Sequence, residues 1–204
     1  MALERYFHRY GKATFSLLLI NLAVYTLEAI LSGNPISIGS NVLLVLGQWN
    51  YAVLHYGWWW QPFTAMFVHV SILHIAFNMY FLLVMGSQLE HVIGPKRLTG
   101  VYIVSGLFGN LLTLVMLPSN TVSAGASGAL FGIAGTLIVM MGVIGGNMQA
   151  ALLNAFFLFV INSILPGVNA YAHLGGLLVG MAIGYYYGKK IRRRMALAYG
   201  YGYY

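Results

Sequence analysis

The stretch ASGALFGIAGTLIVMMGVI (residues 126–144) contains no charged residue, and only Ser127 and Thr136 in it carry polar side chains. An α-helix needs ~20 apolar residues to cross ~30 Å of hydrocarbon, and this stretch comes close to that length. It therefore predicts a transmembrane helix, and comparable apolar stretches lie on both sides of it in the chain.

Six such stretches can be distinguished, at residues 13–31, 64–88, 98–117, 126–144, 149–165 and 170–188. The chain is 60% hydrophobic and only 6% charged, so it cannot form the charged surface of a soluble domain. We predict an all-α polytopic membrane protein with a six-transmembrane-helix bundle, folded as a single domain over residues 1–204. The first stretch follows basic residues as a signal peptide would, but it lacks a small-residue cleavage site, so we predict a retained helix.

The basic residues fall in three places: the N-terminal segment 1–12, Lys96 with Arg97, and the tail 189–204. With six crossings all three face the same side, which the positive-inside rule assigns to the cytoplasm. The net charge of +7 is then explained by orientation, and no nucleic-acid partner is expected. The absence of a transit peptide favours a prokaryotic plasma membrane. The connection between the first two stretches is rich in Trp and Tyr and is predicted to lie on the membrane surface.

Four polar residues are placed at membrane depth, where an unpaired polar group costs several kcal/mol (order of magnitude). They are His74 and Asn78 in the second stretch, Ser127 at the start of the fourth, and His173 at the start of the sixth. Because these three helices run in the same direction, the four side chains converge near the outer face. The topology therefore predicts one polar site.

The residue types suit nucleophilic catalysis. A serine hydroxyl needs a base to remove its proton, and His173 is the histidine that begins a helix beside the Ser127 helix. Ser127 lies in the first turn of its helix, where free N–H groups favour an oxyanion, and His74 and Asn78 can add side-chain donors. The chain contains no Asp, which excludes an aspartyl protease and leaves a Ser–His dyad.

Glycines allow the two helices to approach closely enough for proton transfer. Gly176, Gly180, Gly184 and Gly188 recur every four residues after His173, and Gly128 and Gly132 offer a small surface on the Ser127 helix. Gly125 and Gly128 flank the serine itself. Phe131, one turn after Ser127, is predicted to hold the imidazole by ring packing.

These residues together resemble the rhomboid family of intramembrane serine proteases. The GASG serine motif, the AHLGG histidine motif and the H-x-x-x-N pair are all present, as are W60-Q61-P-F-T64, F67-V-H69-V-S71 and G86-S-Q-L-E90-x-x-x-G94. The resemblance implies that Ser127 is the nucleophile, His173 the general base, and His74 with Asn78 the oxyanion-stabilising pair. It also implies transmembrane segments of membrane proteins as substrates, within the lipid bilayer, and no cofactor.

Two positions depart from the family pattern. Gln61 stands where Arg is common, a change that bears on the lipid anchoring of the first loop, and Phe131 replaces a frequent Tyr. Phe131 keeps the ring and loses only the hydroxyl, so activity is expected to survive.

Several alternatives remain open from the residues alone. Ser127 could be a small residue at a helix contact, and the histidines could form a structural network or a zinc site, although no HExxH motif occurs. A catalytically silent helix-binding protein and a small transporter are the competing functions. His69 is assigned a structural role, and His8, His55 and His91 no chemical role. Glu90 with Lys96 and Arg97 is predicted to form an ion cluster at the cytoplasmic end.

Overall fold

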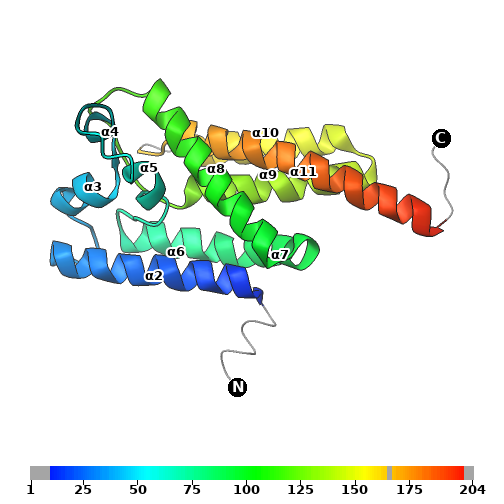
Figure 1. Cartoon of the computed structure of the whole chain (residues 1–204), viewed down its shortest axis with the longest axis horizontal. Coiled ribbons are helices and arrows are strands. Elements are labelled where there is room, and N and C mark those ends of the chain that lie inside the picture. Colours follow the sequence, from blue (N-terminus) through cyan, green and yellow to red (C-terminus); the bar gives the residue numbers. More distant parts are fainter. Residues whose placement is uncertain (1–9, 165–166, 200–204) are drawn as a thin grey trace, which may run out of the picture.

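The computed structural model describes residues 10–164 and 167–199, and helices make up most of this part of the chain (Figure 1). Three parts of the chain lie outside the described residues: residues 1–9 of the predicted segment 1–12, Leu165 with Pro166, and the tail from residue 200. The long helices are α2 (Lys12–Ser32), α8 (Pro95–Met116), α9 (Ser127–Gly145), α10 (Met148–Ser163), α11 (Ala170–Tyr199) and a continuous helix formed by α6 (Ile72–Phe81), the π-helical turn η1 (Leu82–Gly86) and α7 (Ser87–Ile93). Each of the six predicted stretches thus overlaps one of these helices.

The distribution of side chains is that of a protein surrounded by lipid. Large apolar side chains are exposed along the outer helices, including Ile30, Leu73, Val115, Phe156 and Ile164. Four helices in the described part are long and apolar enough to cross a membrane: Lys12–Ser32, Ile72–Ile93, Pro95–Met116 and Ser127–Gly145. Met148–Ser163 is apolar but shorter. The chain is therefore an integral, polytopic membrane protein.

Helix α9 is the central helix of the bundle. Within its apolar window 72% of the residues are buried, against 33% for α2, and it packs against α8, α10 and α11 (Figure 1). The predicted glycine stripe forms its contact with α11. A Cβ on Gly176 would overlap the carbonyl oxygen of Gly128, and one on Gly180 would overlap that of Gly132. The hydroxyl of Thr136 donates to the Gly180 carbonyl at 3.0 Å, a polar link between the two helices.

The second transmembrane helix begins at Ile72, so the prediction that it starts at residue 64 is wrong. Residues 61–64 form the short helix α5 (Gln61–Thr64), and the chain then runs irregularly to Ser71. The Ser71 hydroxyl caps the helix by accepting the backbone N–H of His74 at 3.2 Å. The intervening residues are apolar because they are buried in protein rather than because they cross lipid.

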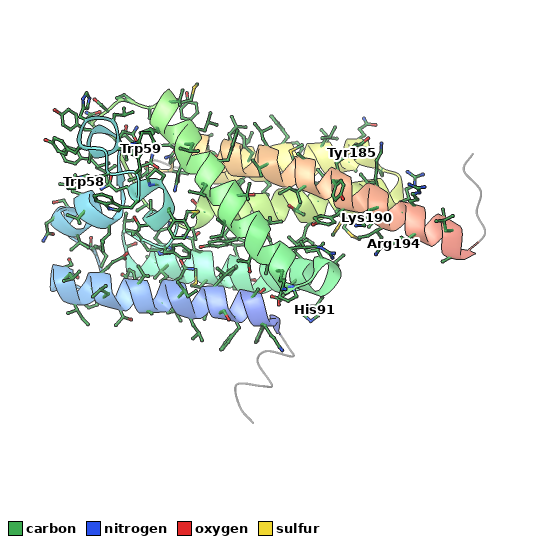
Figure 2. All side chains as sticks on the ribbon, viewed as in Figure 1. Trp58, Trp59, His91, Tyr185, Lys190 and Arg194 are labelled. Carbon is green, nitrogen blue, oxygen red and sulfur yellow. The ribbon has the colours of Figure 1, made fainter. Side chains whose placement is uncertain are left out.

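The first loop packs against one end of the bundle. It contains α3 (Ser40–Leu46), the two-residue strand β1 (Gln48–Trp49), α4 (Asn50–Tyr56) and α5, which cluster together in Figure 1. Its aromatic rings contact one another, and Figure 2 shows Trp58 and Trp59 at this end of the molecule. Trp59 is 60% exposed, which suits a ring at the membrane interface.

The predicted ion cluster of Glu90 with Lys96 and Arg97 is wrong. The buried Glu90 carboxylate accepts hydrogen bonds from the backbone N–H of Ala13 at 3.0 Å and of Thr14 at 2.7 Å, and also from the Thr14 hydroxyl. It therefore caps the first turn of α2, where four N–H groups lack helical partners. Arg97 instead donates to the Ile93 carbonyl at 3.0 Å.

Candidate active site

Ser127 is the first residue of α9 and is partly exposed. The residue before it, Ala126, has no side chain that could cap the helix, so no capping side chain bonds the first N–H groups of α9. These groups and the positive end of the helix dipole favour a negative charge at this position.

The segment that leads into Ser127 is held in place by the first loop. Strand β2 (Val122–Ser123) pairs antiparallel with β1, and the backbone N–H of Gly125 donates to the Ala65 carbonyl at 2.9 Å. Gly125 has a φ of 134°, a conformation that favours glycine. A Cβ there would lie 2.7 Å from Cε1 of His74 and 3.7 Å from Oγ of Ser127. The absence of a side chain at Gly125 therefore lets the His74 imidazole lie beside the serine.

His173 lies in the first turn of α11 and is 5% exposed. Its imidazole stacks on the ring of Phe131, with centroids 4.1 Å apart and planes inclined by 17°, which is the ring contact predicted from the spacing. A Cβ on Gly128 would lie only 3.1 Å from the Ala172 carbonyl oxygen, so the residues next to Ser127 and His173 are in contact. Nδ1 of His173 lies 3.0 Å from the hydroxyl of Ser163, the last residue of α10.

Ser127 and His173 are thus on adjoining turns of touching helices. Within the described residues they form no hydrogen bond to each other; the hydrogen bond of His173 goes to Ser163. Catalytic hydrogen bonds are often long without substrate and shorten when it binds. The arrangement leaves Nε2 as the nitrogen available to Ser127.

His74 and Asn78 lie one turn apart on α6. Asn78 is 5% exposed, and its amide Nδ2 has no hydrogen-bond partner among the described residues. The same holds for the buried Nδ1 of His74. Buried polar atoms are nearly always paired, so these two unpaired atoms can serve as hydrogen-bonding partners of a bound ligand.

The comparison with known proteins agrees with this arrangement. The family model described as "Rhomboid domain" matches residues 56–190, which include all four polar residues and the glycine stripe. The chain belongs to the rhomboid family.

Relatives of this rhomboid occur in plants, parasites and bacteria. It is 36% identical over 132 residues to RHOMBOID-like protein 6, mitochondrial, of Arabidopsis thaliana, covering 62% of the chain and 43% of the relative. It is 30% identical over 168 residues to Rhomboid-like protease 1 of Toxoplasma gondii, covering 77% and 57%. It is 31% identical over 179 residues to Rhomboid protease GluP of Bacillus subtilis, covering 83% and 34%. The chain therefore spans between about a third and somewhat over half of these relatives.

Gln61 of this rhomboid is an internal residue of the first loop. It is fully buried, and its side chain accepts the Trp49 N–H at 2.9 Å while donating to the Leu44 and Val45 carbonyls at 2.7 and 3.2 Å. The departure at this position therefore bears on the internal structure of the loop. Because the side chain is buried, it does not act in lipid anchoring, contrary to the expectation from the sequence.

His69 lies next to His74 and contacts its ring. Its ring lies edge-on to that of His74, with centroids 5.2 Å apart, and its backbone N–H donates to the buried Glu28 carboxylate at 3.1 Å. Burial, with a smaller contribution from His74, lowers the pKa of His69 to about 3. His69 is therefore neutral at physiological pH, and its Nδ1 can donate to the Phe67 carbonyl, 3.1 Å away. These contacts fit the structural role predicted for it.

Sequence analysis missed two residues of the site. Asn169 caps α11 by accepting the Ala172 N–H at 3.0 Å, and it donates to Thr113 and Ser123 at 2.9 Å each. Its position directly before the apolar stretch 170–188 is an N-cap signal that could have identified it. Ser163 has no comparable signal, because small hydroxyl residues are common in membrane helices.

Proposed function

We propose that this rhomboid is an intramembrane serine endopeptidase that uses Ser127 as nucleophile and His173 as general base. The observation that carries the proposal is the placement of His173: its imidazole stacks on Phe131, one turn after Ser127, where α9 and α11 touch at Gly128 and Ala172. The protease names of the Toxoplasma and Bacillus relatives support the same reaction.

In the proposed mechanism, Oγ of Ser127 attacks the carbonyl carbon of the scissile bond while its proton passes to Nε2 of His173. The tetrahedral oxyanion is stabilised by the first N–H groups of α9 and by donors from His74 and Asn78. The proton on Nε2 then passes to the amine of the leaving peptide. Water repeats the sequence on the acyl-enzyme and regenerates Ser127.

The substrates we propose are transmembrane segments of membrane proteins. Large apolar side chains cover the outside of the bundle, while Ser127 is partly exposed, so a lipid-embedded chain and water could both reach the serine. A helical substrate must unwind locally, because helical carbonyls are hydrogen-bonded and shielded. We further propose that residues 1–204 form one transmembrane domain of a prokaryotic plasma membrane, with both termini cytoplasmic and the site toward the outer face.

The purified protein in proteoliposomes tests the proposal against a panel of single-span substrates and a fluorophosphonate probe. Ser127→Ala and His173→Ala are each expected to lower cleavage by several orders of magnitude, as loss of a nucleophile or base does. Asn78→Ala should slow cleavage by about 100-fold, since one oxyanion donor contributes ~3 kcal/mol.

Ser119→Ala is the matched control, because Ser119 is an exposed serine in the loop before β2. It should be labelled and should cleave like the unmodified protein. Wild-type turnover by His173→Ala would show that another group is the base. Binding of substrate helices with neither cleavage nor labelling would favour the silent helix-binding protein. Cysteines introduced at residues 119 and 194, probed from each side of the membrane, test the orientation.

A further inference from the structure

The first inference concerns the imidazole of His173 and rests on the proposed function. Ser163 Oγ lies 3.0 Å from Nδ1 of His173, a hydrogen-bond distance. In the described part of the chain the acidic residues Glu28 and Glu90 are bonded elsewhere, to His69 and to the start of α2, so no carboxylate orients this base. We propose that Ser163 is the positioning residue of His173 and takes the place of the acidic residue in a three-residue triad.

The bond selects the tautomer that the reaction needs. When Ser163 accepts the proton of Nδ1–H, the lone pair of the imidazole is on Nε2, which can then remove the Ser127 proton. The imidazolium formed in that step keeps its Nδ1–H bond to Ser163, and Nε2–H later protonates the leaving amine. If the hydroxyl donated instead, the proton would reside on Nε2 and Ser127 would have no base.

Phe131 and Ser163 hold the ring in different ways. Stacking on Phe131 fixes the plane of the imidazole but does not distinguish the two nitrogens. Only the hydrogen bond to Ser163 distinguishes Nδ1 from Nε2. The two contacts come from α9 and α10, so the base on α11 is aligned by two of its neighbouring helices.

The test compares Ser163→Ala, Ser163→Thr and the control Asn162→Ala in the full chain. Asn162 is adjacent to Ser163, but its side chain donates to the Leu158 carbonyl within α10. Ser163→Ala should lower kcat by about tenfold with little change in KM, the usual effect of losing a hydrogen bond to a charged group. Ser163→Thr should restore most of the rate, and Asn162→Ala should keep it.

A spectroscopic measurement separates positioning from general packing. The ¹⁵N shifts of His173 should report mainly the Nδ1–H form in the unmodified protein and in Ser163→Thr, and a shift toward Nε2–H in Ser163→Ala. Unchanged shifts and kcat in Ser163→Ala, with cleavage still abolished by Ser127→Ala, would overturn this inference alone. Cleavage that survives Ser127→Ala would overturn the proposed function instead.

A second inference rests on an independent feature at the opposite end of the bundle. A cavity of about 1010 Å³ lies between the end of α9, the start of α10 and the C-terminal half of α11. Its rim carries the exposed cations Lys189, Lys190, Arg192, Arg193 and Arg194. Val143, Met148 and Leu197 give it apolar walls. Figure 2 shows Tyr185, Lys190 and Arg194 along this half of α11, away from Trp58 and Trp59.

The cationic rim has no carboxylate partner within the described residues, since Glu28 and Glu90 are bonded elsewhere. Lys189 lies over the ring of Tyr185 at 4.7 Å, which orients one cation along the cavity wall. Phosphodiester oxygens suit the cations, and acyl chains suit the apolar walls. We infer that this cavity binds the headgroup of an anionic phospholipid.

Native mass spectrometry of the protein released from nanodiscs of phosphatidylcholine with phosphatidylglycerol tests this site. The double variant Lys190→Gln/Arg193→Gln should retain phosphatidylglycerol about 30-fold less well, since each cation near an anionic lipid contributes independently. The matched control Lys12→Gln/Lys96→Gln removes the same charge from other helices and should retain it normally. Equal retention by the two variants would overturn the inference. Displacement of the lipid by millimolar inorganic phosphate would also overturn it and indicate a site for free anions.

Discussion

Substituting Gly176 by Ala should separate α9 from α11 and thereby test the close approach on which the candidate site depends. A Cβ at this position would overlap the carbonyl oxygen of Gly128, a backbone atom that cannot rotate away. Overpacking of a filled contact costs about 1–3 kcal/mol, and a rigid backbone neighbour favours the upper value. Because alanine is a better helix former than glycine by about 1 kcal/mol, the net destabilisation should be about 2 kcal/mol.

Gly100 provides the matched control for this prediction. It lies in helix α8, and a Cβ there would meet no atom within 4 Å. Gly100→Ala therefore gains the helix propensity without a clash and should stabilise the protein by about 1 kcal/mol. The two variants should differ by about 3 kcal/mol in the free energy of unfolding, measured by helix content in mixed micelles with increasing dodecyl sulfate.

Cleavage should separate the two variants further. A displacement of about 1 Å between catalytic groups can cost about 100-fold in rate. Gly176→Ala should therefore lose most of its kcat, and Gly100→Ala should keep it. If Gly176→Ala unfolded and cleaved like Gly100→Ala, the helices would not approach as closely as their glycines indicate, and the argument for proton transfer between them would fail.

Three further substitutions give independent tests. Phe131→Leu removes a ring contact with His173 that contributes about 1 kcal/mol, so kcat should fall about fivefold in substrate cleavage assays, while Phe131→Tyr should keep it. Gln61→Ala removes three hydrogen bonds of about 1 kcal/mol each, and limited proteolysis should then cut the first loop faster than in the unmodified protein. Glu90→Ala leaves the first turn of α2 uncapped and should lower the free energy of unfolding by about 3 kcal/mol; an unchanged value would contradict the cap.

The helices could be predicted from the sequence because lipid offers no hydrogen bonds to the backbone. A chain that crosses the membrane must satisfy its own polar groups, so a long apolar run implies a helix. The same argument failed at residues 65–71, which are mostly apolar but irregular. There the backbone is satisfied by other parts of the protein: the Ala65 carbonyl accepts the Gly125 N–H, and the Val70 carbonyl accepts that of Ile38. Hydropathy cannot distinguish burial in protein from burial in lipid.

Partners distant in sequence were the other source of error. Glu90 was expected to pair with Lys96 and Arg97 because they are near it in the chain, whereas its carboxylate binds the start of α2. Its partners are backbone N–H groups, which every residue but proline has and which no sequence motif marks. Gln61 is a similar case, since all three of its hydrogen bonds go to backbone groups of the first loop.

The proximity of Ser127 and His173 could be predicted because few residue types can act as nucleophile and base, and because the order of crossings limits which of them can meet. Neither restriction applies to Ser163, which became visible only through its distance to the imidazole. Its position also has a consequence for the packing of α10. In the described part of the chain, the buried residues of α10 are Ala151 and Ala155, while Phe156, Phe157 and Ile161 are exposed. Because so little of α10 is buried, the hydrogen bond between Ser163 and His173 also ties this helix to α11.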